Sequence, residues 1–274
     1  MTAERIERIF AARRAEGRSA LVVYITIGDP SVEDSLACAR AALRAGADCL
    51  ELGVPFSDPT ADGPVIAAAA YRAIQCGGSL RAALDTARRL RPESDAALVL
   101  FTYYNPVVAF GEAKLPAAAA EAGVDGLLLV DLPPEEGQVL RRACASEKLA
   151  VIPLVAPTTG LEREPKVLSN ASGFVYYVSV TGTTGTGVAP LVQAGQEAAR
   201  LRARAKLPVV VGFGIRTPEY AKSVVAQGVD GVVVGTEVVR VIAAAGSTEA
   251  RVAAVEELVG ALRRGLDEAS AGAR

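Results

Sequence analysis

The chain has 274 residues, of which 51% are hydrophobic, so it can bury a large core as one large domain or two small ones. Its 29 basic and 31 acidic residues give a formal net charge of -2, with no basic run and no acidic tail. Nucleic acids and other polyanions are therefore not expected as partners. Backbone N–H groups could still hold a small anion, because they leave no mark in the net charge.

The sequence contains no histidine, which excludes Ser-His-Asp and Cys-His nucleophile systems and every histidine metal site. Acid–base chemistry therefore falls to Glu, Asp, Tyr, Lys or Cys. The four cysteines are scattered and form no CxxC pair, which is typical of reduced thiols in the cytosol. No apolar run reaches the length of a membrane span, and residues 2–18 lack the apolar stretch of a signal peptide. We therefore expect a cytoplasmic protein without a membrane partner.

The first elements of the chain can be placed by their spacing. Apolar residues recur at helical intervals before Gly17 and predict a short amphipathic helix. A β-branched strand follows at residues 21–25. Ser31 is a candidate N-cap for the next helix, which we expect to run to Gly46.

A short pattern then occurs three times along the chain. Each copy has an alanine-rich helix, a glycine suited to a helix C-cap, an aspartate and a buried strand. The copies are Ala45-Gly46-Ala47-Asp48, Ala122-Gly123-Val124-Asp125 and Gln227-Gly228-Val229-Asp230. Such a pattern is the helix-to-strand half of a βα unit.

Eight buried strands can be placed in total, at residues 21–25, 49–52, 97–102, 126–131, 151–154, 173–178, 209–211 and 231–235. A longer gap after the second strand holds a loop at 58–64 and a helix at 65–90 that breaks at Gly77-Gly78. This arrangement predicts an α/β fold, a (β/α)₈ TIM barrel with an extra N-terminal helix, as a single domain over residues 1–274. A doubly wound open sheet is the alternative, but the GxGxxG common after its first strand is missing there.

Glu51 interrupts the second strand, where it stands between Leu50 and Leu52. A lone buried carboxylate is costly unless it is paired or protonated. Glu51 is therefore either part of a structural ion pair or a catalytic acid–base with a raised pKa. Asp62, at the far end of the following loop, is the natural second carboxylate.

In such a barrel the active site lies at the carboxyl ends of the strands. This rule gathers Glu51 and Asp62 into one cup with four more side chains, which are Tyr24, Tyr103, Tyr176 and Asp131. Any single tyrosine of this set could be a core residue instead. Their shared position at strand ends favours a site with aromatic walls.

Glycine-rich turns follow the last three strands, at residues 181–187, at Gly212-Phe213-Gly214 and at Gly235-Thr236. Glycine lets a backbone approach an anion closely, and threonine adds hydroxyl donors. Barrel enzymes often bind phosphate after strands seven and eight, so these turns predict a phosphate site rather than tight turns alone. The loop at 181–190 is either a lid over the ligand or a flexible surface loop.

Residues 50–64, which read LELGVPFSDPTADGP, closely resemble the signature of the tryptophan synthase α subunit family. Further matching stretches follow in the same order, at residues 24–30, 102–106, 175–179, 212–215 and 231–235. The resemblance covers nearly the whole chain. It implies a (β/α)₈ carbon–carbon lyase that cleaves indole-3-glycerol phosphate to indole and D-glyceraldehyde 3-phosphate. The family needs no cofactor or metal, and it works in tryptophan biosynthesis with a β subunit in an α2β2 complex.

The resemblance also implies roles for single residues. Glu51 matches the acid–base residue that handles the protons at indole C3 and at the glycerol hydroxyl. Asp62 matches the carboxylate that faces the indole N–H, and Tyr176 matches the tyrosine that supports these two acids. The phosphate-side positions match Thr184, Gly185, Phe213, Gly214, Gly235 and Thr236, and the indole end matches Tyr24 and Tyr103.

Thr60 replaces the leucine usual in this family, within the loop that faces the β subunit there. The substitution leaves coupling to a β subunit open. Two alternatives therefore stand beside the α-subunit reading: a stand-alone lyase that releases free indole, and a non-catalytic α-like subunit that binds phosphate ligands and regulates a partner.

Overall fold

The computed structural model describes residues 3–178, 188–212 and 214–271. Within these ranges nine strands form one parallel sheet, in the order β5-β4-β3-β2-β1-β9-β8-β7-β6. The strands are β1 (Ala20–Thr26), β2 (Cys49–Gly53), β3 (Ala97–Thr102), β4 (Gly126–Leu129), β5 (Ala150–Ile152), β6 (Leu154–Val155), β7 (Val175–Val178), β8 (Val209–Gly212) and β9 (Gly231–Val234).

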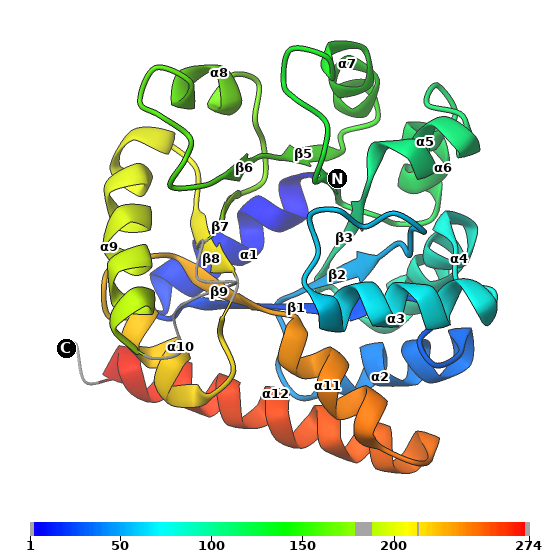
Figure 1. Ribbon diagram of the computed structural model, residues 1–274. Coiled ribbons are helices and arrows are strands. Elements are labelled where there is room, and N and C mark those ends of the chain that lie inside the picture. The colour runs from blue at the N-terminus through cyan, green and yellow to red at the C-terminus, as the bar shows by residue number, and fades with distance from the viewer. Residues whose placement is uncertain (1–2, 179–187, 213, 272–274) are drawn as a thin grey trace.

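Pro153 explains why nine strands are found where eight are predicted. It separates β5 from β6, so the single strand predicted at 151–154 is wrong in detail. A proline has no N–H to give to a sheet, and it is found at such interruptions. β5 pairs with β4, β6 pairs with β7, and the Pro153 carbonyl accepts the Tyr176 N–H at 2.9 Å. The two short strands β5 and β6 together take the place of one strand of the barrel. The sheet therefore closes as the predicted eight-stranded barrel (Figure 1).

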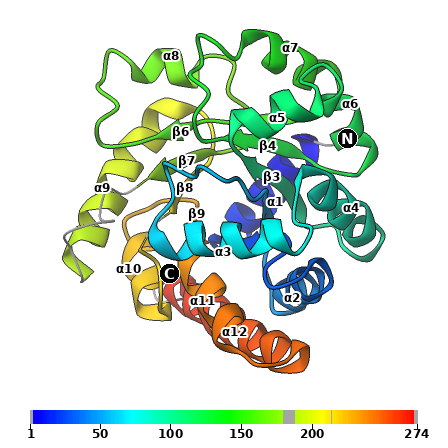
Figure 2. The same ribbon diagram turned by 45° about the vertical axis from the view of Figure 1, so that its right-hand side comes forward.

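Helices surround the barrel on its outside (Figures 1 and 2). They are α1 (Ala3–Ala15), α2 (Val32–Arg44), α3 (Pro64–Gln75), α4 (Leu80–Leu90), η1 (Arg91–Glu93), α5 (Tyr104–Phe110), α6 (Leu115–Glu121), α7 (Gln138–Ser146), α8 (Glu164–Leu168), α9 (Val188–Ala205), α10 (Pro218–Val225), α11 (Thr236–Ala244) and α12 (Thr248–Ala271). The predicted N-cap is confirmed, since the Ser31 hydroxyl accepts the Asp34 N–H at 3.0 Å. The predicted break at Gly77-Gly78 is also confirmed, because it separates α3 from α4.

The strands divide the core into two layers. Residues such as Val23 and Ile25 pack outward against the helices, whereas Val22 and Tyr24 fill the inside of the barrel. α1 closes the amino-terminal end of the barrel, because Ile6 belongs to the inner layer and the ring of Phe10 lies 5.4 Å from that of Phe174. Burying two such side chains contributes roughly 3–6 kcal/mol, at about 1.5–3 kcal/mol each.

The three repeated aspartates share one structural role at the amino-terminal end of the barrel. Each follows a glycine with a positive φ, as the predicted C-caps require. Each carboxylate accepts the N–H of the first or second residue of a neighbouring strand, at 2.9 Å. The three pairs are Asp48 with Leu21, Asp125 with Leu98, and Asp230 with Val209. The repeat therefore sets the register of adjacent strands.

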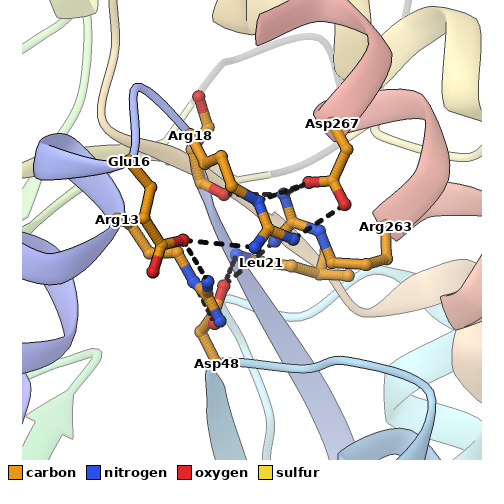
Figure 3. Close-up of polar contacts among 8 residues, drawn as sticks. Arg13, Glu16, Arg18, Leu21, Asp48, Arg263 and Asp267 are labelled. Atoms are coloured by element: carbon orange, nitrogen blue, oxygen red, sulfur yellow. Dashed lines mark hydrogen bonds and ion pairs between the residues drawn. The ribbon is translucent and has the colours of Figure 1, made fainter. Parts of the chain in front are cut away.

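Two arginines also bind each of these aspartates, and one of the two always comes from α1. The α1 donors are Arg13 to Asp48, Arg5 to Asp125 and Arg14 to Asp230. Figure 3 shows the network around Asp48, which accepts hydrogen bonds from Arg13 at 2.7 Å and from Arg263 at 3.1 Å. In the same network, Arg18 and Arg263 both form ion pairs with Asp267. α1 is thus fixed to three βα units by charge as well as by apolar packing.

Asp125→Asn is expected to lower the free energy of unfolding by about 3 kcal/mol, measured by urea denaturation at pH 7. The asparagine can still accept the Leu98 N–H, but it leaves the largely buried guanidinium groups of Arg5 and Arg91 without their shared carboxylate. Asp95→Asn is the matched control, because Asp95 also faces Arg5 but its side chain is 80% exposed. That change should cost less than about 1 kcal/mol. Equal losses in the two variants would contradict a buried role for Asp125.

Candidate active site

Glu51 lies inside the barrel, in the same layer as Tyr24 of β1 and Val99 of β3. Its side chain is fully buried, and neither carboxyl oxygen has a hydrogen-bond partner among the described residues. Burial raises the pKa of Glu51 to about 8. The structural ion pair that the sequence left open is therefore not found in these ranges. Glu51 is instead a carboxylic acid that keeps its proton at neutral pH and has free oxygens.

Asp62 lies on the loop between β2 and α3, and it is less enclosed than Glu51. Burial raises the pKa of Asp62 to about 6, and a hydrogen bond from Tyr103 opposes the rise. At neutral pH Asp62 is therefore mostly a carboxylate. The two acids hold opposite protonation states at the same pH, as expected for a pair with separate acid and charge-stabilising roles.

Tyr103 holds this loop in place. Its side chain is buried directly after β3, and its hydroxyl accepts the Ala61 N–H at 2.9 Å while bonding to Asp62. The ring of Phe56, at the start of the loop, lies 5.2 Å from the Tyr103 ring. Tyr103, which the resemblance placed at the indole end, thus also orients the Asp62 carboxylate.

Tyr24, Phe101 and Tyr176 form an aromatic wall beside Glu51. The Phe101 ring lies 5.2 Å from Tyr24 and 6.5 Å from Tyr176, edge-on to both. Burial raises the pKa of Tyr24 and of Tyr176, and the negative charge of Asp62, together with that of Glu51 once Glu51 is ionised, raises both further. Both phenols therefore stay protonated, and the two tyrosines share one electrostatic environment with the two acids.

Two glycines make room for the tyrosine hydroxyl groups. A Cβ on Gly53 of β2 would lie 2.3 Å from the Tyr24 hydroxyl oxygen, and one on Gly212 of β8 would lie 2.1 Å from that of Tyr176. Neither distance is compatible with a side chain at these positions. The absence of a side chain on the neighbouring strand therefore lets each phenol lie across the barrel interior.

The predicted phosphate side is described only in part. Gly235 precedes α11 and Thr236 is the first residue of that helix, so free N–H groups of its first turn meet the carboxyl end of β9. Gly214 has a φ of +83° at the turn after β8. Thr184, Gly185 and Phe213 lie outside the described residues, as does most of the predicted lid at 181–190.

Asp131 lies at the rim of the cup that the sequence predicted, where burial raises the pKa of Tyr103 and the charge of Asp131 raises it further. β4 ends at Leu129, and Asp131 is exposed beyond it. Its carboxylate accepts the Tyr104 N–H at 2.7 Å, at the start of α5. Asp131 therefore connects two loops at the rim.

Phe56 and Gly53 were not predicted from the sequence to belong to the site, and Gly212 was predicted only as part of a phosphate-binding turn. The alternation of side chains along a strand gives a partial signal, because Gly53 and Gly212 have the same parity as inward-facing residues on their strands. In the described part of the chain, no three Cys, Asp or Glu side chains gather in a way that could hold a metal ion. Nor does any helix there have the length and apolar character needed to cross a membrane.

These observations define a (β/α)₈ barrel in which two carboxyl groups with raised pKa values lie toward the carboxyl ends of the strands. The comparisons with known proteins are more specific. The family model for the tryptophan synthase alpha chain matches residues 10–267. A tryptophan synthase alpha chain from Gluconacetobacter diazotrophicus is 51% identical over 222 residues, which is 81% of each chain.

Solved structures agree with this match. The structure of tryptophan synthase subunit alpha from Legionella pneumophila is 36% identical and has a TM-score of 0.88, covering 96% of this chain and 98% of the other. A chain of tryptophan synthase from M. tuberculosis is 34% identical with a TM-score of 0.85, covering 96% and 99%. The chain belongs to the tryptophan synthase alpha chain family, and its role is that of the alpha subunit in tryptophan biosynthesis. Membership implies a lyase activity.

Proposed function

We propose that the chain cleaves indole-3-glycerol phosphate to indole and D-glyceraldehyde 3-phosphate by a retro-aldol reaction. The observation that supports this best is Glu51, a protonated carboxyl group inside the barrel with both oxygens unpartnered among the described residues. A buried acid with free oxygens is available to a substrate and serves no structural purpose that the described contacts reveal.

The cleavage moves one proton from oxygen to carbon. Glu51 gives its proton to C3 of the indole ring, which makes C3 tetrahedral and places positive charge on the ring nitrogen. The resulting Glu51 carboxylate takes the proton of the glycerol hydroxyl next to C3. The carbon–carbon bond then breaks, its electron pair returns to the ring, and the oxygen becomes the aldehyde of the second product. Glu51 ends protonated, so the cycle is balanced without a cofactor.

Asp62 stabilises the intermediate in this proposal. Its carboxylate faces the indole N–H, and it attracts the positive charge that develops on that nitrogen. Tyr103 supports this role because it fixes the Asp62 loop through Ala61 and bonds to the carboxylate. Tyr24, Phe101 and Tyr176 form the apolar surface against which the indole ring packs.

The phosphate of the substrate binds on the other side of the cup. Thr236 and the first turn of α11 supply a helix N-terminus, and Gly235 and Gly214 let the backbone come close to the phosphate oxygens. We assign Thr184, Gly185 and Phe213 to this side on the family motif alone. The substrate would then span the barrel from α11 to the Asp62 loop.

A β subunit is the partner that we propose, in an α2β2 complex. Three exposed apolar side chains lie in the segments that follow β3, β4 and β6. They are Val108, Val139 and Leu161, with exposed fractions of 53%, 63% and 73%. Exposed apolar side chains in the segments after these strands suit a partner that receives the indole. We also propose a cytoplasmic location, because all four cysteines are free thiols.

Release of indole from indole-3-glycerol phosphate tests the proposal directly, with the purified chain alone and with a β subunit added. Strong stimulation by the β subunit supports the complex. High turnover by the chain alone supports a stand-alone lyase. No indole in either condition would overturn both, and would favour a regulatory subunit that only binds ligand.

The dependence of kcat/KM on pH is expected to be bell-shaped. Activity should rise as Asp62 loses its proton near pH 6, and fall as Glu51 loses its proton near pH 8. Both conditions hold between these values, so the maximum lies at about pH 7. Initial rates of indole release from pH 5 to 9 in buffers of constant ionic strength measure this. A flat profile across that range would contradict the paired protonation states.

A further inference from the structure

A cavity lies at the carboxyl ends of β4 and β5, and neither Glu51 nor α11 contributes to its lining. Its volume is about 260 Å³, below the roughly 300 Å³ at which pockets for drug-sized ligands begin. Its lining combines apolar side chains with two arginines, including Leu129, Leu132, Leu140, Ile152, Arg141 and Arg163. A small ligand with a charged group would fit this lining.

Arg141 of α7 is the unusual residue here. Its Nη1 is buried with no hydrogen-bond partner, and its side chain forms no hydrogen bond or ion pair with any residue in the described ranges. Burial lowers the pKa of Arg141, and no nearby carboxylate opposes this. An arginine stays charged in a protein all the same. The fold therefore holds a partly desolvated positive charge without a counter-ion.

Other enclosed arginines of this chain do have counter-ions. Arg263 contacts both Asp48 and Asp267, and Arg91 contacts Asp125. Arg163, the second arginine in the cavity lining, pairs with the exposed Glu135 at 3.2 Å. Of the arginines in the described residues that are at least partly buried, Arg141 is the one without a carboxylate partner.

The surroundings of Arg141 are also positive. A groove of about 660 Å³ runs between α7 and α8, which stand next to each other in Figures 1 and 2, and Arg141 lines it as well. Arg142 and Lys166 line the same groove and form no salt bridge with a described residue, while Glu135 is its one acidic lining residue. Arg141 therefore lines both hollows, and the larger one has more basic than acidic side chains in its lining.

Asp131 is the carboxylate in the lining of the smaller cavity, but it does not neutralise Arg141. Its Oδ1 accepts the Tyr104 N–H at 2.7 Å, and it forms no salt bridge with Arg141. The negative charge of Asp131 will weaken anion binding somewhat, so we expect a site of millimolar rather than micromolar strength.

We propose that Arg141 binds a small oxyanion, a phosphate or carboxylate group of a metabolite, in the cavity between α7 and the carboxyl ends of β4 and β5. The planar guanidinium can hold two oxygens of such a group at once, and Arg142 and Lys166 add attraction from the groove. The site shares no side chain with the proposed catalytic one, and it does not depend on the reaction proposed above.

Thermal unfolding with and without 20 mM sodium phosphate tests this, at constant ionic strength with sodium chloride as the reference. The proteins are the wild type, Arg141→Met, Arg141→Lys and the control Arg264→Met. Arg264 is exposed on α12, on another side of the barrel. A second arm with malonate in place of phosphate distinguishes a phosphate-binding site from a carboxylate-binding one.

A millimolar site filled at this concentration should raise the Tm of the wild type by roughly 3 °C more than chloride does. That increment should disappear in Arg141→Met, fall by more than half in Arg141→Lys, and persist in Arg264→Met. Phosphate bound at the proposed catalytic site contributes equally to all four proteins and cancels. If Arg141→Met does not fold, Arg141→Lys decides the result. Equal increments in the wild type and the Arg141 variants, with both anions, would overturn the proposal.

Discussion

Glu51→Gln is expected to reduce kcat for indole release by about 10³-fold or more. Glutamine has nearly the same shape as the protonated acid, so the barrel should fold around it without a new cavity. It cannot give a proton to C3 or take one from the glycerol hydroxyl. Substrate binding should survive, because the proposed phosphate site lies on other strands, so KM should change little. Single-turnover indole release and equilibrium binding of the substrate measure the two effects separately.

A second buried glutamate provides the control. Glu164 is also enclosed, but both of its oxygens bond to Arg204 at 2.7 Å. Glu164→Gln should lower stability and leave kcat within about twofold of the wild type, because it lies outside the proposed site. Retained turnover in Glu51→Gln, or an equal loss in both variants, would remove Glu51 from the acid–base role.

The ionisation of Glu51 should also make the free energy of unfolding depend on pH. Its pKa rises from an ordinary 4.5 to about 8 in the folded chain, so the folded state holds a proton that the unfolded state releases. The contribution of Glu51 to the free energy of unfolding is therefore complete below pH 4.5, and it is lost as pH rises through about 8. The loss is on the order of 5 kcal/mol over this window. Glu51→Gln should lack this dependence and be more stable than the wild type above pH 8.

The sequence predicted the barrel because the evidence for it is local and repeated. Eight apolar segments at regular spacing and three copies of a glycine–aspartate pattern allow few other arrangements. Glu51 was conspicuous for the same reason, since one charge in an apolar strand breaks the local pattern. The structure adds that the Glu51 carboxyl group has no hydrogen-bond partner in the described residues, which no pattern of residue types can reveal.

Other features depended on contacts between distant segments. The repeat showed that Asp125 recurs in a fixed place, but not that Arg5 and Arg91, far apart in sequence, bind it. Pro153 was visible within a predicted strand, yet the division into two strands depends on their different partners. Arg141 resembles any other surface arginine in the sequence. Its isolation follows from the packing of α7 on the loops after β4 and β5.

Asp62→Asn is expected to reduce kcat by about 10²-fold. Asparagine can still accept the hydrogen bond of Tyr103, so the loop should keep its position while the negative charge is lost. The positively charged ring nitrogen then has no counter-charge in the intermediate. The rise in activity near pH 6 should disappear, because that limb belongs to Asp62, whereas the fall near pH 8 should remain with Glu51.

The pH profile separates this role from a merely structural one. Asp58→Asn is the control in the same loop, because Asp58 is exposed and its carboxylate accepts a hydrogen bond from the neighbouring Ser57 hydroxyl. In the isolated chain this variant should keep both the rise in activity near pH 6 and the fall near pH 8. Tyr103→Phe removes the hydrogen bond that lowers the pKa of Asp62, so it should move the first limb above pH 6. An Asp62→Asn enzyme that keeps the limb near pH 6 would assign that titration to another group. It would also leave the developing charge on the indole nitrogen without its proposed counter-charge.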